Sequence, residues 1–294
     1  MSITGPIFAL ATPFKRKDID YIALGKYLDF LEKKGVKTIL TNGTTGEFFS
    51  LTREERKELL SFCRKHFKGF IINHIGSTCL KDSLFLLEEG LESCDGVISL
   101  PPYYYSPVTS RGLELFFSEL LERCPQPFYL YHFPRHTQIP LGEDVITSLK
   151  GKYNMLRGIK DSGGELEVSL KYKALGLEVY MGKESGVLEA LDRGIDGHVS
   201  GAGNPVAEFL IKLYDCYNNN QGEKALEVQR AYEVWNRFRK SLPAREIGIV
   251  KAGLAARIEG FPLEVRYPLE EASKEGDLIK RTIREDLLPL LGSL

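Results

Sequence analysis

The sequence lacks the features of several specialised protein classes. It has only five cysteines in 294 residues, no CxxC pair among them, and a formal net charge of −1. An odd number of scattered cysteines argues against a disulfide framework and against a zinc ribbon, and it fits a reducing cytosol. A net charge this close to zero gives no electrostatic reason to expect nucleic acid or an anionic membrane as a partner.

Targeting signals are missing as well. Residues 1–6 contain no basic segment followed by an apolar core, so no signal peptide is predicted. No apolar run approaches the roughly 20 residues that a membrane-spanning helix needs. We therefore expect a cytoplasmic protein that does not interact with a membrane.

The residues that are present predict an α/β barrel. Hydrophobic residues make up 43 % of the chain and charged residues 27 %, as in ordinary globular proteins. Short strand-like runs alternate with longer amphipathic segments, which is the pattern of a parallel sheet. The runs cover residues 7–12, 36–41, 70–75, 96–100, 128–131, 156–160, 178–181 and 197–200. Eight of them predict a closed (β/α)8 TIM barrel, a fold of about 250 residues. The alternative is an open, doubly wound sheet, but no GxGxxG turn follows the first strand.

The last part of the chain predicts helices. Helical patterns cover residues 205–218, 221–240, 245–258 and 269–291, with Pro262 and Pro268 between the last two. One of these helices would complete the barrel. We therefore expect a barrel over residues 1–220 and a C-terminal helical region over residues 221–294, which packs on the barrel and is available to a subunit interface.

Lys160 is the candidate nucleophile. It ends a buried strand and precedes Asp161, Ser162 and two glycines, which places its side chain at the mouth of a loop. A lysine amine attacks a ketone only when unprotonated, and burial can lower a lysine pKa by up to about 3 to 5 units. The alternative is a lysine that pairs with Asp161 or extends into solvent.

Other candidates follow neighbouring strands, where barrel enzymes build their active sites. Gly43, Thr44 and Thr45 offer hydroxyls and free backbone N–H groups that suit a small carboxylate; the alternative is a turn that caps the next helix. Tyr131 could exchange a proton with a substrate oxygen; the alternative is a core tyrosine. Residues 103–105 are three tyrosines, which cannot all face one way.

The seventh and eighth strands contribute Gly182 and Val199. Glycines at such strand ends let the backbone approach a small ligand closely. His132 and His136 lie four residues apart, and they would form a metal pair only on a helix. Pro134 lies between them and argues against a helix, so no metal site is expected.

In these motifs the sequence resembles the class I, Schiff-base pyruvate lyases, a family that includes dihydrodipicolinate synthase, N-acetylneuraminate lyase and 2-keto-3-deoxygluconate aldolase. The resemblance covers nearly the whole chain, from residues 11–14 through 43–56, 102–104, 131–134, 158–161 and 197–204 to 250–254 and 265–269. It implies a carbon–carbon lyase that needs no cofactor and forms an imine between Lys160 and pyruvate. Members of the family are commonly homotetramers, built as dimers of dimers.

The resemblance also implies roles for individual residues. Tyr131 is similar to the tyrosine that shuttles protons, and Thr44 and Thr45 match the pair that binds the pyruvate carboxylate. Tyr104 matches a tyrosine that in some members reaches across a dimer interface into the neighbouring site. Gly43, Arg135, Gly182 and Val199 complete the expected binding site.

The resemblance leaves several substrates open. Dihydrodipicolinate synthases usually have an arginine five residues after the tyrosine; here that residue is His136, and Arg135 lies one place earlier. N-acetylneuraminate lyases usually have two adjacent acids after the glycine of the seventh strand, whereas this chain has Lys183 and Glu184. The Pro-Tyr-Tyr-Tyr run and the Tyr-Leu-Tyr strand resemble those of the 2-keto-3-deoxygluconate aldolases, and this resemblance implies a 2-keto-3-deoxy sugar acid as substrate, with dihydrodipicolinate synthase activity as the closest alternative. Two further readings are a metal-dependent aldolase and a barrel that binds a 2-oxo acid without catalysis.

Overall fold

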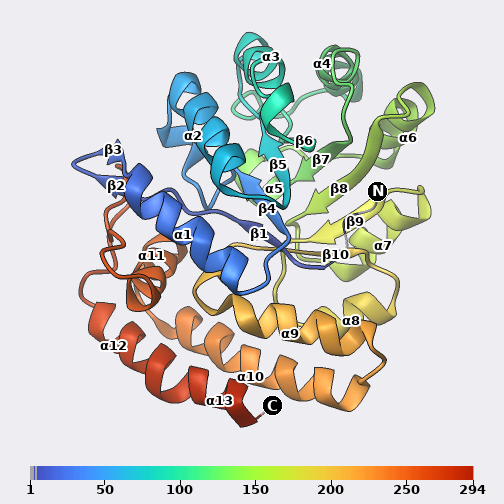
Figure 1. The fold of residues 1–294 in the computed structure, drawn as a ribbon. Helices are drawn as coiled ribbons and strands as arrows, with labels where there is room; N and C mark the ends of the chain where they lie inside the picture. The colour runs from blue at the N-terminus through green and yellow to red at the C-terminus, as the bar shows by residue number, and fades with distance from the viewer. Residues whose placement is uncertain (1–2, 4, 294) are drawn as a thin grey trace.

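The computed structural model describes residue 3 and residues 5–293, and within them eight parallel strands close into a barrel (Figure 1). The strands are β1 (Ile7–Ala9), β4 (Thr38–Thr41), β5 (Phe70–His74), β6 (Gly96–Ser99), β7 (Phe128–His132), β8 (Leu156–Asp161), β9 (Glu178–Met181) and β10 (Gly197–Ser200). Strand β1 pairs with both β4 and β10, which closes the sheet. The predicted (β/α)8 barrel is confirmed, with each strand inside or within two residues of a predicted run. Part of the segment in which we looked for a signal peptide, residues 1, 2 and 4, lies outside the described residues.

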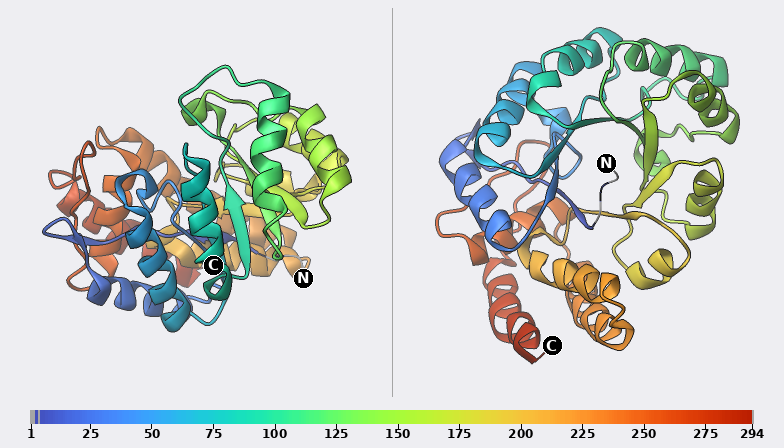
Figure 2. Two further views of the ribbon diagram at one scale, coloured as in Figure 1. Left: turned by 90° about the horizontal axis from the view of Figure 1, so that it is seen from above. Right: turned by 45° about the vertical axis from the view of Figure 1, so that its right-hand side comes forward.

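A ring of helices surrounds the strands (Figure 2). The main helices that follow successive strands are α1 (Tyr21–Lys33), α2 (Arg53–His66), α3 (Leu80–Glu88), α4 (Ser110–Leu121), α6 (Glu143–Lys152), α7 (Leu166–Ala174), α8 (Val187–Asp192) and α9 (Ala207–Asn218). Helix α2 begins with a capping box: Thr52 accepts a hydrogen bond from the Glu55 N–H, and the Glu55 carboxylate accepts one from the Thr52 N–H. Alternation along the strands separates two faces. Inward side chains fill the barrel, and outward ones pack against the helices.

Two short elements were not predicted. Strands β2 (Phe14–Lys15) and β3 (Asp18–Ile19) form a hairpin, and its two turn residues, Arg16 and Lys17, have positive φ. A two-residue turn with positive φ at both positions matches the right-handed twist of a hairpin. Helix α5 (Pro134–Thr137) has proline at its first position. The prediction that Pro134 excludes a helix is therefore wrong, because the missing N–H of proline is not needed in the first helical turn.

The C-terminal region forms α10 (Gly222–Ser241), α11 (Glu246–Arg257), α12 (Gly276–Arg281), a π-helical turn (Thr282–Leu287) and α13 (Leu288–Ser293). Figure 1 shows α9, α10, α12 and α13 together on the outside of the barrel, where α10 packs on α9 and α12 packs on α11. The last helical stretch was predicted to begin at residue 269, but it begins at Gly276. Residues 262–269 are instead irregular, because the prolines interrupt the helical pattern and the intervening backbone bonds to other elements.

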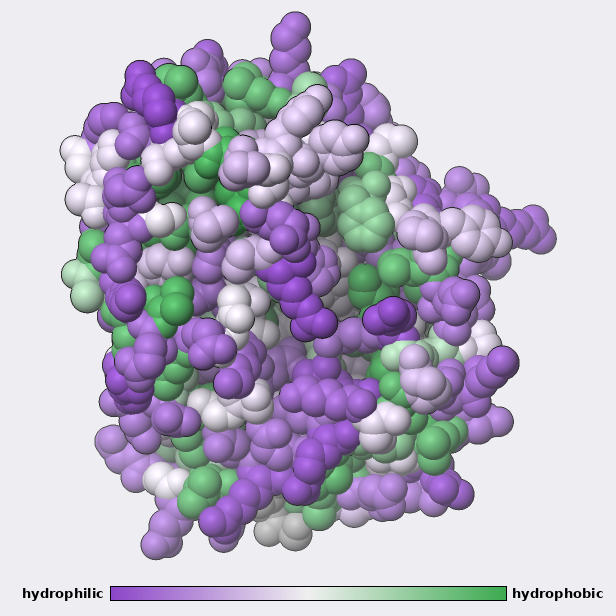
Figure 3. Space-filling view, turned by 180° about the vertical axis from the view of Figure 1, so that it is seen from behind, coloured by the Kyte–Doolittle hydropathy of each residue, from purple (hydrophilic) through white to green (hydrophobic). Residues whose placement is uncertain are grey.

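The molecular surface is mainly polar on the side opposite to Figure 1, and apolar side chains are scattered among the polar ones (Figure 3). None of the helices in the described part of the chain is long and apolar enough to cross a membrane.

Candidate active site

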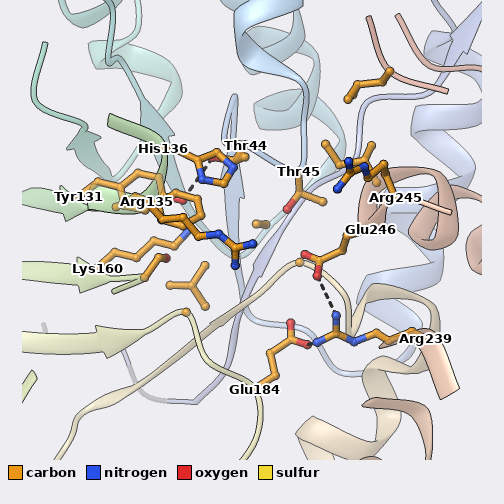
Figure 4. A pocket seen from close by; sticks show the side chains of 18 of the residues that line it. Thr44, Thr45, Tyr131, Arg135, His136, Lys160, Glu184, Arg239, Arg245 and Glu246 are labelled. Atoms are coloured by element: carbon orange, nitrogen blue, oxygen red, sulfur yellow. Dashed lines mark hydrogen bonds and ion pairs between the residues drawn. The ribbon is translucent and has the colours of Figure 1, made fainter. Parts of the chain in front are cut away.

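A cavity of about 740 Å³ lies at the carboxyl ends of the barrel strands (Figure 4). Seven of the nine predicted site residues line it, namely Thr44, Thr45, Tyr131, Arg135, Lys160, Gly182 and Val199. Gly43 and Tyr104 do not line the cavity. The candidate site is thus at the end of the barrel where TIM-barrel enzymes carry their catalytic residues.

Lys160 is buried in the barrel with only 6 % of its surface exposed. Strand β8 places it beside Tyr131 of β7 in the ladder, and its Nζ lies 4.0 Å from the centre of the Tyr131 ring. None of the described carboxylates is within ion-pair distance of this Nζ. The Asp161 side chain points to the outside of the barrel, where it accepts hydrogen bonds from Ser169 and the Gly163 N–H and lies 3.1 Å from His132. The alternative reading, in which Lys160 pairs with Asp161 or extends into solvent, is therefore wrong.

Tyr131 and Thr44 connect the lysine to the turn after β4. The Tyr131 hydroxyl lies 3.2 Å from Thr44 Oγ1, within hydrogen-bond distance. The Tyr131 ring stacks on Phe133, with ring centres 5.8 Å apart, and its whole residue is 1 % exposed. Two hydroxyls and one amine thus lie together at the bottom of the cavity.

The turn over residues 43–47 presents both threonines to the cavity. It is closed by hydrogen bonds from the Gly46 N–H to the Gly43 carbonyl (3.0 Å) and from the Glu47 N–H to the Thr44 carbonyl (3.0 Å). Helix α2 is capped by Thr52, so the two threonines do not serve as its cap. Their hydroxyls and neighbouring backbone remain at the cavity wall.

The opposite wall comes from β9 and from the C-terminal region, and most of it was missed in the sequence. This wall is lined by Arg239 of α10, by Glu246 of α11, by Arg245, which is the N-cap residue of α11, and by Glu184 (Figure 4). Arg239 donates hydrogen bonds to Glu184 (3.1 Å) and to Glu246 (2.7 Å). The helical periodicity of this region gave no signal for these residues, because it does not reveal that the helices return to the mouth of the barrel.

Hydrogen bonds hold the Glu184 side chain in one position in that wall. It is 6 % exposed, and its carboxylate accepts hydrogen bonds from Ser200 (2.5 Å), the Ala202 N–H (3.0 Å) and Tyr232 (3.0 Å) as well as from Arg239. A carboxylate with four donors has its acceptor sites occupied. Glu184 therefore orients Arg239 and shapes the cavity.

Arg135 and Arg245 also reach the cavity, from α5 and from the start of α11. Neither guanidinium has an ion-pair partner among the described residues. His136, which follows Arg135 in α5, also lines the cavity and stacks on Phe133 with ring centres 4.1 Å apart. Burial, together with the neighbouring Arg135 charge, lowers the pKa of His136 and favours its neutral form. The cavity therefore contains two cations that are free to bind a ligand.

His74 supports the turn that carries the threonines. It is buried, its Nδ1 lies 2.8 Å from the Asn42 carbonyl, and its ring packs edge-on against Tyr131. Because a carbonyl only accepts, Nδ1 carries the proton. Burial and the Arg56 charge hold the pKa of His74 well below its usual range. The described residues include no group of three His, Cys, Asp or Glu side chains that could hold a metal ion.

The three consecutive tyrosines separate as expected. Tyr103 is partly buried against Phe48, whereas Tyr104 and Tyr105 are 84 % and 80 % exposed. Tyr104 projects from its own barrel, so its reach into a neighbouring site stays a prediction.

Comparison with known proteins identifies the family. The model of the dihydrodipicolinate synthetase family matches residues 2–285. The chain belongs to this family. It is 29 % identical to N-acetylneuraminate lyase of Danio rerio over 91 % of each chain. It is 28 % identical to 4-hydroxy-tetrahydrodipicolinate synthase of Methanocaldococcus jannaschii, over 95 % of this chain and 96 % of that one. Among solved structures, dihydrodipicolinate synthase from Aquifex aeolicus superposes with a TM-score of 0.84 at 27 % identity, covering 96 % of this chain and 97 % of that one.

The predicted family and enzyme class are confirmed: this dihydrodipicolinate synthetase-family chain is a carbon–carbon lyase of the Schiff-base, pyruvate-dependent group. A third relative, from Sulfurisphaera tokodaii, is a 2-dehydro-3-deoxy-phosphogluconate/2-dehydro-3-deoxy-6-phosphogalactonate aldolase, 29 % identical over 92 % of each chain. Relatives with three different substrates thus match this chain at 28–29 % identity.

Proposed function

We propose that the protein is a class I aldolase that reversibly cleaves a 2-keto-3-deoxy sugar acid to pyruvate and an aldehyde. The observation that carries this proposal is the cluster of Lys160, Tyr131 and Thr44. Its lysine is buried, beside a phenol and a hydroxyl, and has no carboxylate partner among the described residues. A buried amine of this kind is suited to form an imine.

In the proposed mechanism the turn binds the carboxylate of the 2-oxo acid. Hydroxyls and backbone N–H groups of Thr44 and Thr45 provide the hydrogen bonds. Lys160 Nζ, as the neutral amine, then adds to the C2 carbonyl. The Tyr131 hydroxyl gives its proton to the departing oxygen and water leaves, which gives a protonated imine on Lys160 and a phenolate on Tyr131. No metal or organic cofactor is needed in this proposal, because the imine itself withdraws electrons from C3.

Cleavage of the C3–C4 bond needs one base. We assign Tyr131, as phenolate, to remove the proton of the C4 hydroxyl; the C3–C4 electron pair then moves towards the imine nitrogen. The aldehyde leaves, and an enamine remains on Lys160. Protonation of the enamine at C3 by Tyr131, followed by hydrolysis of the imine, releases pyruvate and restores the lysine.

The polar wall of the cavity supports the proposal that the aldehyde part of the substrate carries several hydroxyl groups. Arg239 and Glu246 offer donors and acceptors across the cavity from Lys160, and Arg135 and Arg245 offer unpaired positive charge. An aldehyde with hydroxyls and an acidic group, a carboxylate or a phosphate, would match this chemistry. Arg135 also favours the second candidate, dihydrodipicolinate synthase activity with aspartate semialdehyde, because that aldehyde carries a carboxylate. N-acetylneuraminate lyase activity is the third candidate.

We further propose a homotetramer in which Tyr104 contacts a neighbouring subunit. Two adjacent tyrosines that are at least 80 % exposed are unusual on a free surface. Sedimentation analysis of the wild type and of Tyr104→Ser tests this assembly; a monomeric wild type would contradict it.

Borohydride trapping tests the proposed function. Pyruvate and borohydride should add one irreversible adduct to wild-type protein, on the peptide that contains Lys160. Lys160→Arg keeps a long basic side chain but cannot form the imine, so it should show no adduct. A panel of 2-keto-3-deoxy acids, neutral or acidic at the far end, and aspartate semialdehyde then identifies the substrate. Turnover only with aspartate semialdehyde would replace the first candidate by the second, and trapping without any turnover would support a non-catalytic barrel.

A further inference from the structure

A buried ion pair joins the C-terminal region to the turn that carries the threonines. Glu47 ends this turn, and Lys251 lies in the middle of α11. The side chains of both residues are 0 % exposed, and Lys251 Nζ lies 2.5 Å from Glu47 Oε1. Burying two charges is costly even when they pair, so such a pair is weak evidence for stability alone. The surrounding contacts support a different role for this pair, which is to hold the residue 43–47 turn in one conformation.

The remaining acceptors and donors of this pair are directed to one segment. Glu47 Oε2 accepts a hydrogen bond from the Arg266 N–H (2.9 Å), and Lys251 Nζ donates to the Glu264 carbonyl (2.6 Å). The Arg266 guanidinium donates to the Ser50 carbonyl (2.8 Å), just after the turn. Residues 264–266 are therefore held to the turn through both its last side chain and the backbone that follows it.

The turn transmits these contacts to the candidate site. Glu47 has a positive φ of 58° and donates its N–H to the Thr44 carbonyl. Thr44 in turn contacts Tyr131 through its hydroxyl. Two residues beyond Arg266, Pro268 begins a stretch that lines the same cavity. A displacement of the Glu47 side chain would therefore move the threonine hydroxyls relative to the lysine.

We propose that Glu47 and Lys251 are positioning residues, whose buried ion pair holds the residue 43–47 turn in the geometry that binds the carboxylate of the 2-oxo acid. The proposal rests on the proposed function in one respect, the binding of that carboxylate by Thr44 and Thr45. Under this proposal the C-terminal region, through Lys251, affects the affinity for pyruvate in addition to packing on the barrel.

The decisive variant removes both charges together. Removing one partner of a buried pair leaves an uncompensated charge and can prevent folding, whereas replacing both partners is often neutral for stability. In Glu47→Gln/Lys251→Met, glutamine keeps an acceptor for the Arg266 N–H and methionine keeps the length of the lysine stem. The matched control is Glu208→Gln/Arg257→Met, which breaks an ion pair between α9 and α11 that does not touch the turn.

We would measure the melting temperature, the KM for pyruvate in the synthesis direction, the Kd for pyruvate by calorimetry, and borohydride trapping at saturating pyruvate. For Glu47→Gln/Lys251→Met we expect KM and Kd to rise at least tenfold, while trapping at saturation still labels Lys160 fully. For the control pair we expect KM and Kd within twofold of wild type, whatever its melting temperature.

Three outcomes overturn the proposal, and they distinguish a failure of the positioning role from a failure of the proposed function. If wild-type protein is trapped but the Glu47→Gln/Lys251→Met variant keeps the KM and Kd of wild type within twofold, the positioning role is wrong and the proposed function stands. If wild-type protein neither binds nor is trapped by pyruvate, the proposed function fails and the positioning role fails with it. If this variant does not fold, Glu47→Asp, which keeps the charge but shortens its reach to Lys251, must raise the Kd for pyruvate; an unchanged Kd in that variant overturns the proposal.

Discussion

A Tyr131→Phe substitution removes one oxygen from the centre of the candidate site and keeps the aromatic ring. The ring contacts that hold this residue, at 4.0 Å to Lys160 Nζ and 5.8 Å to the Phe133 ring, do not involve the hydroxyl. What is lost is the contact of 3.2 Å with Thr44 Oγ1. The variant thus separates proton transfer from packing.

The size of the effect follows from these contacts. Losing one hydrogen bond and leaving the Thr44 hydroxyl with one partner fewer should lower the free energy of unfolding by only about 1–2 kcal/mol. Losing a general acid–base group should lower kcat by roughly 10²–10⁴-fold. Imine formation on Lys160 should slow but still go to completion with borohydride, because the amine and the carboxylate-binding turn are intact.

Tyr129→Phe is the matched control. Tyr129 lies two residues earlier on β7, also points into the barrel, and bonds through its hydroxyl to Glu178 (3.3 Å) of β9, two strands further round the barrel. Its loss should change stability but leave kcat within about twofold. Steady-state kinetics of both variants provide the test. A Tyr131→Phe enzyme with kcat within tenfold of wild type, or a Tyr129→Phe enzyme equally impaired, would refute the assignment of Tyr131 as the proton-transfer group.

Three further predictions follow from the packing. Burial lowers the pKa of His198 to about 3, whereas in the unfolded chain its pKa is about 6.5. As the pH falls, the unfolded state therefore takes up a proton first. Between pH 7 and pH 5 this residue should lower the free energy of unfolding by about 2 kcal/mol. Denaturant titrations at both pH values should show that His198→Asn lacks this part of the pH dependence. An equal pH dependence in the variant and the wild type would contradict the prediction. Cys79 is exposed, while the other four thiols are buried and burial raises the pKa of three of them to between about 11 and 12. A thiol reagent should thus label one cysteine per folded chain and five after unfolding. In Gly201→Ala the new Cβ would clash with the Thr45 hydroxyl, so the KM for pyruvate should rise with little change in the melting temperature; an unchanged KM would remove Thr45 from the binding site.

The barrel was predictable because its strands are buried on both faces. Such strands appear in the sequence as short apolar runs, and eight of them between helical segments leave few possible arrangements. The location of Lys160 and Tyr131 followed from the same pattern. Both end a strand, and all parallel strands of a barrel end on one side, so residues distant in the sequence must meet there. Pairing of Tyr131 with Lys160 in the ladder is the direct result.

The opposite wall of the cavity was not predictable in this way. Arg245 and Glu246 begin a helix outside the β/α repeat, and helical periodicity indicates which face is buried but not which neighbour buries it. Their place at the cavity depends on tertiary contacts, above all the bonds of Arg239 to Glu184 and Glu246. The only sequence signal was an acid after the seventh strand, Glu184, whose partners are distant in the sequence.

The contrast between the strand-end residues and the opposite wall of the cavity matches the way the relatives differ in substrate. The atoms that would form and cleave the imine come from strand ends, whose positions are determined by the closure of the barrel. The groups that would contact the aldehyde come from α5, α10 and α11, which can be repacked without moving a strand. Three different substrates among relatives of nearly equal identity are the expected consequence, because a change at Arg135 or Arg245 alters the aldehyde site and leaves Lys160, Tyr131 and the threonine turn in place. The same reasoning predicts that pyruvate binding depends on the C-terminal region only through contacts such as that of Lys251 with Glu47, which reach the turn itself.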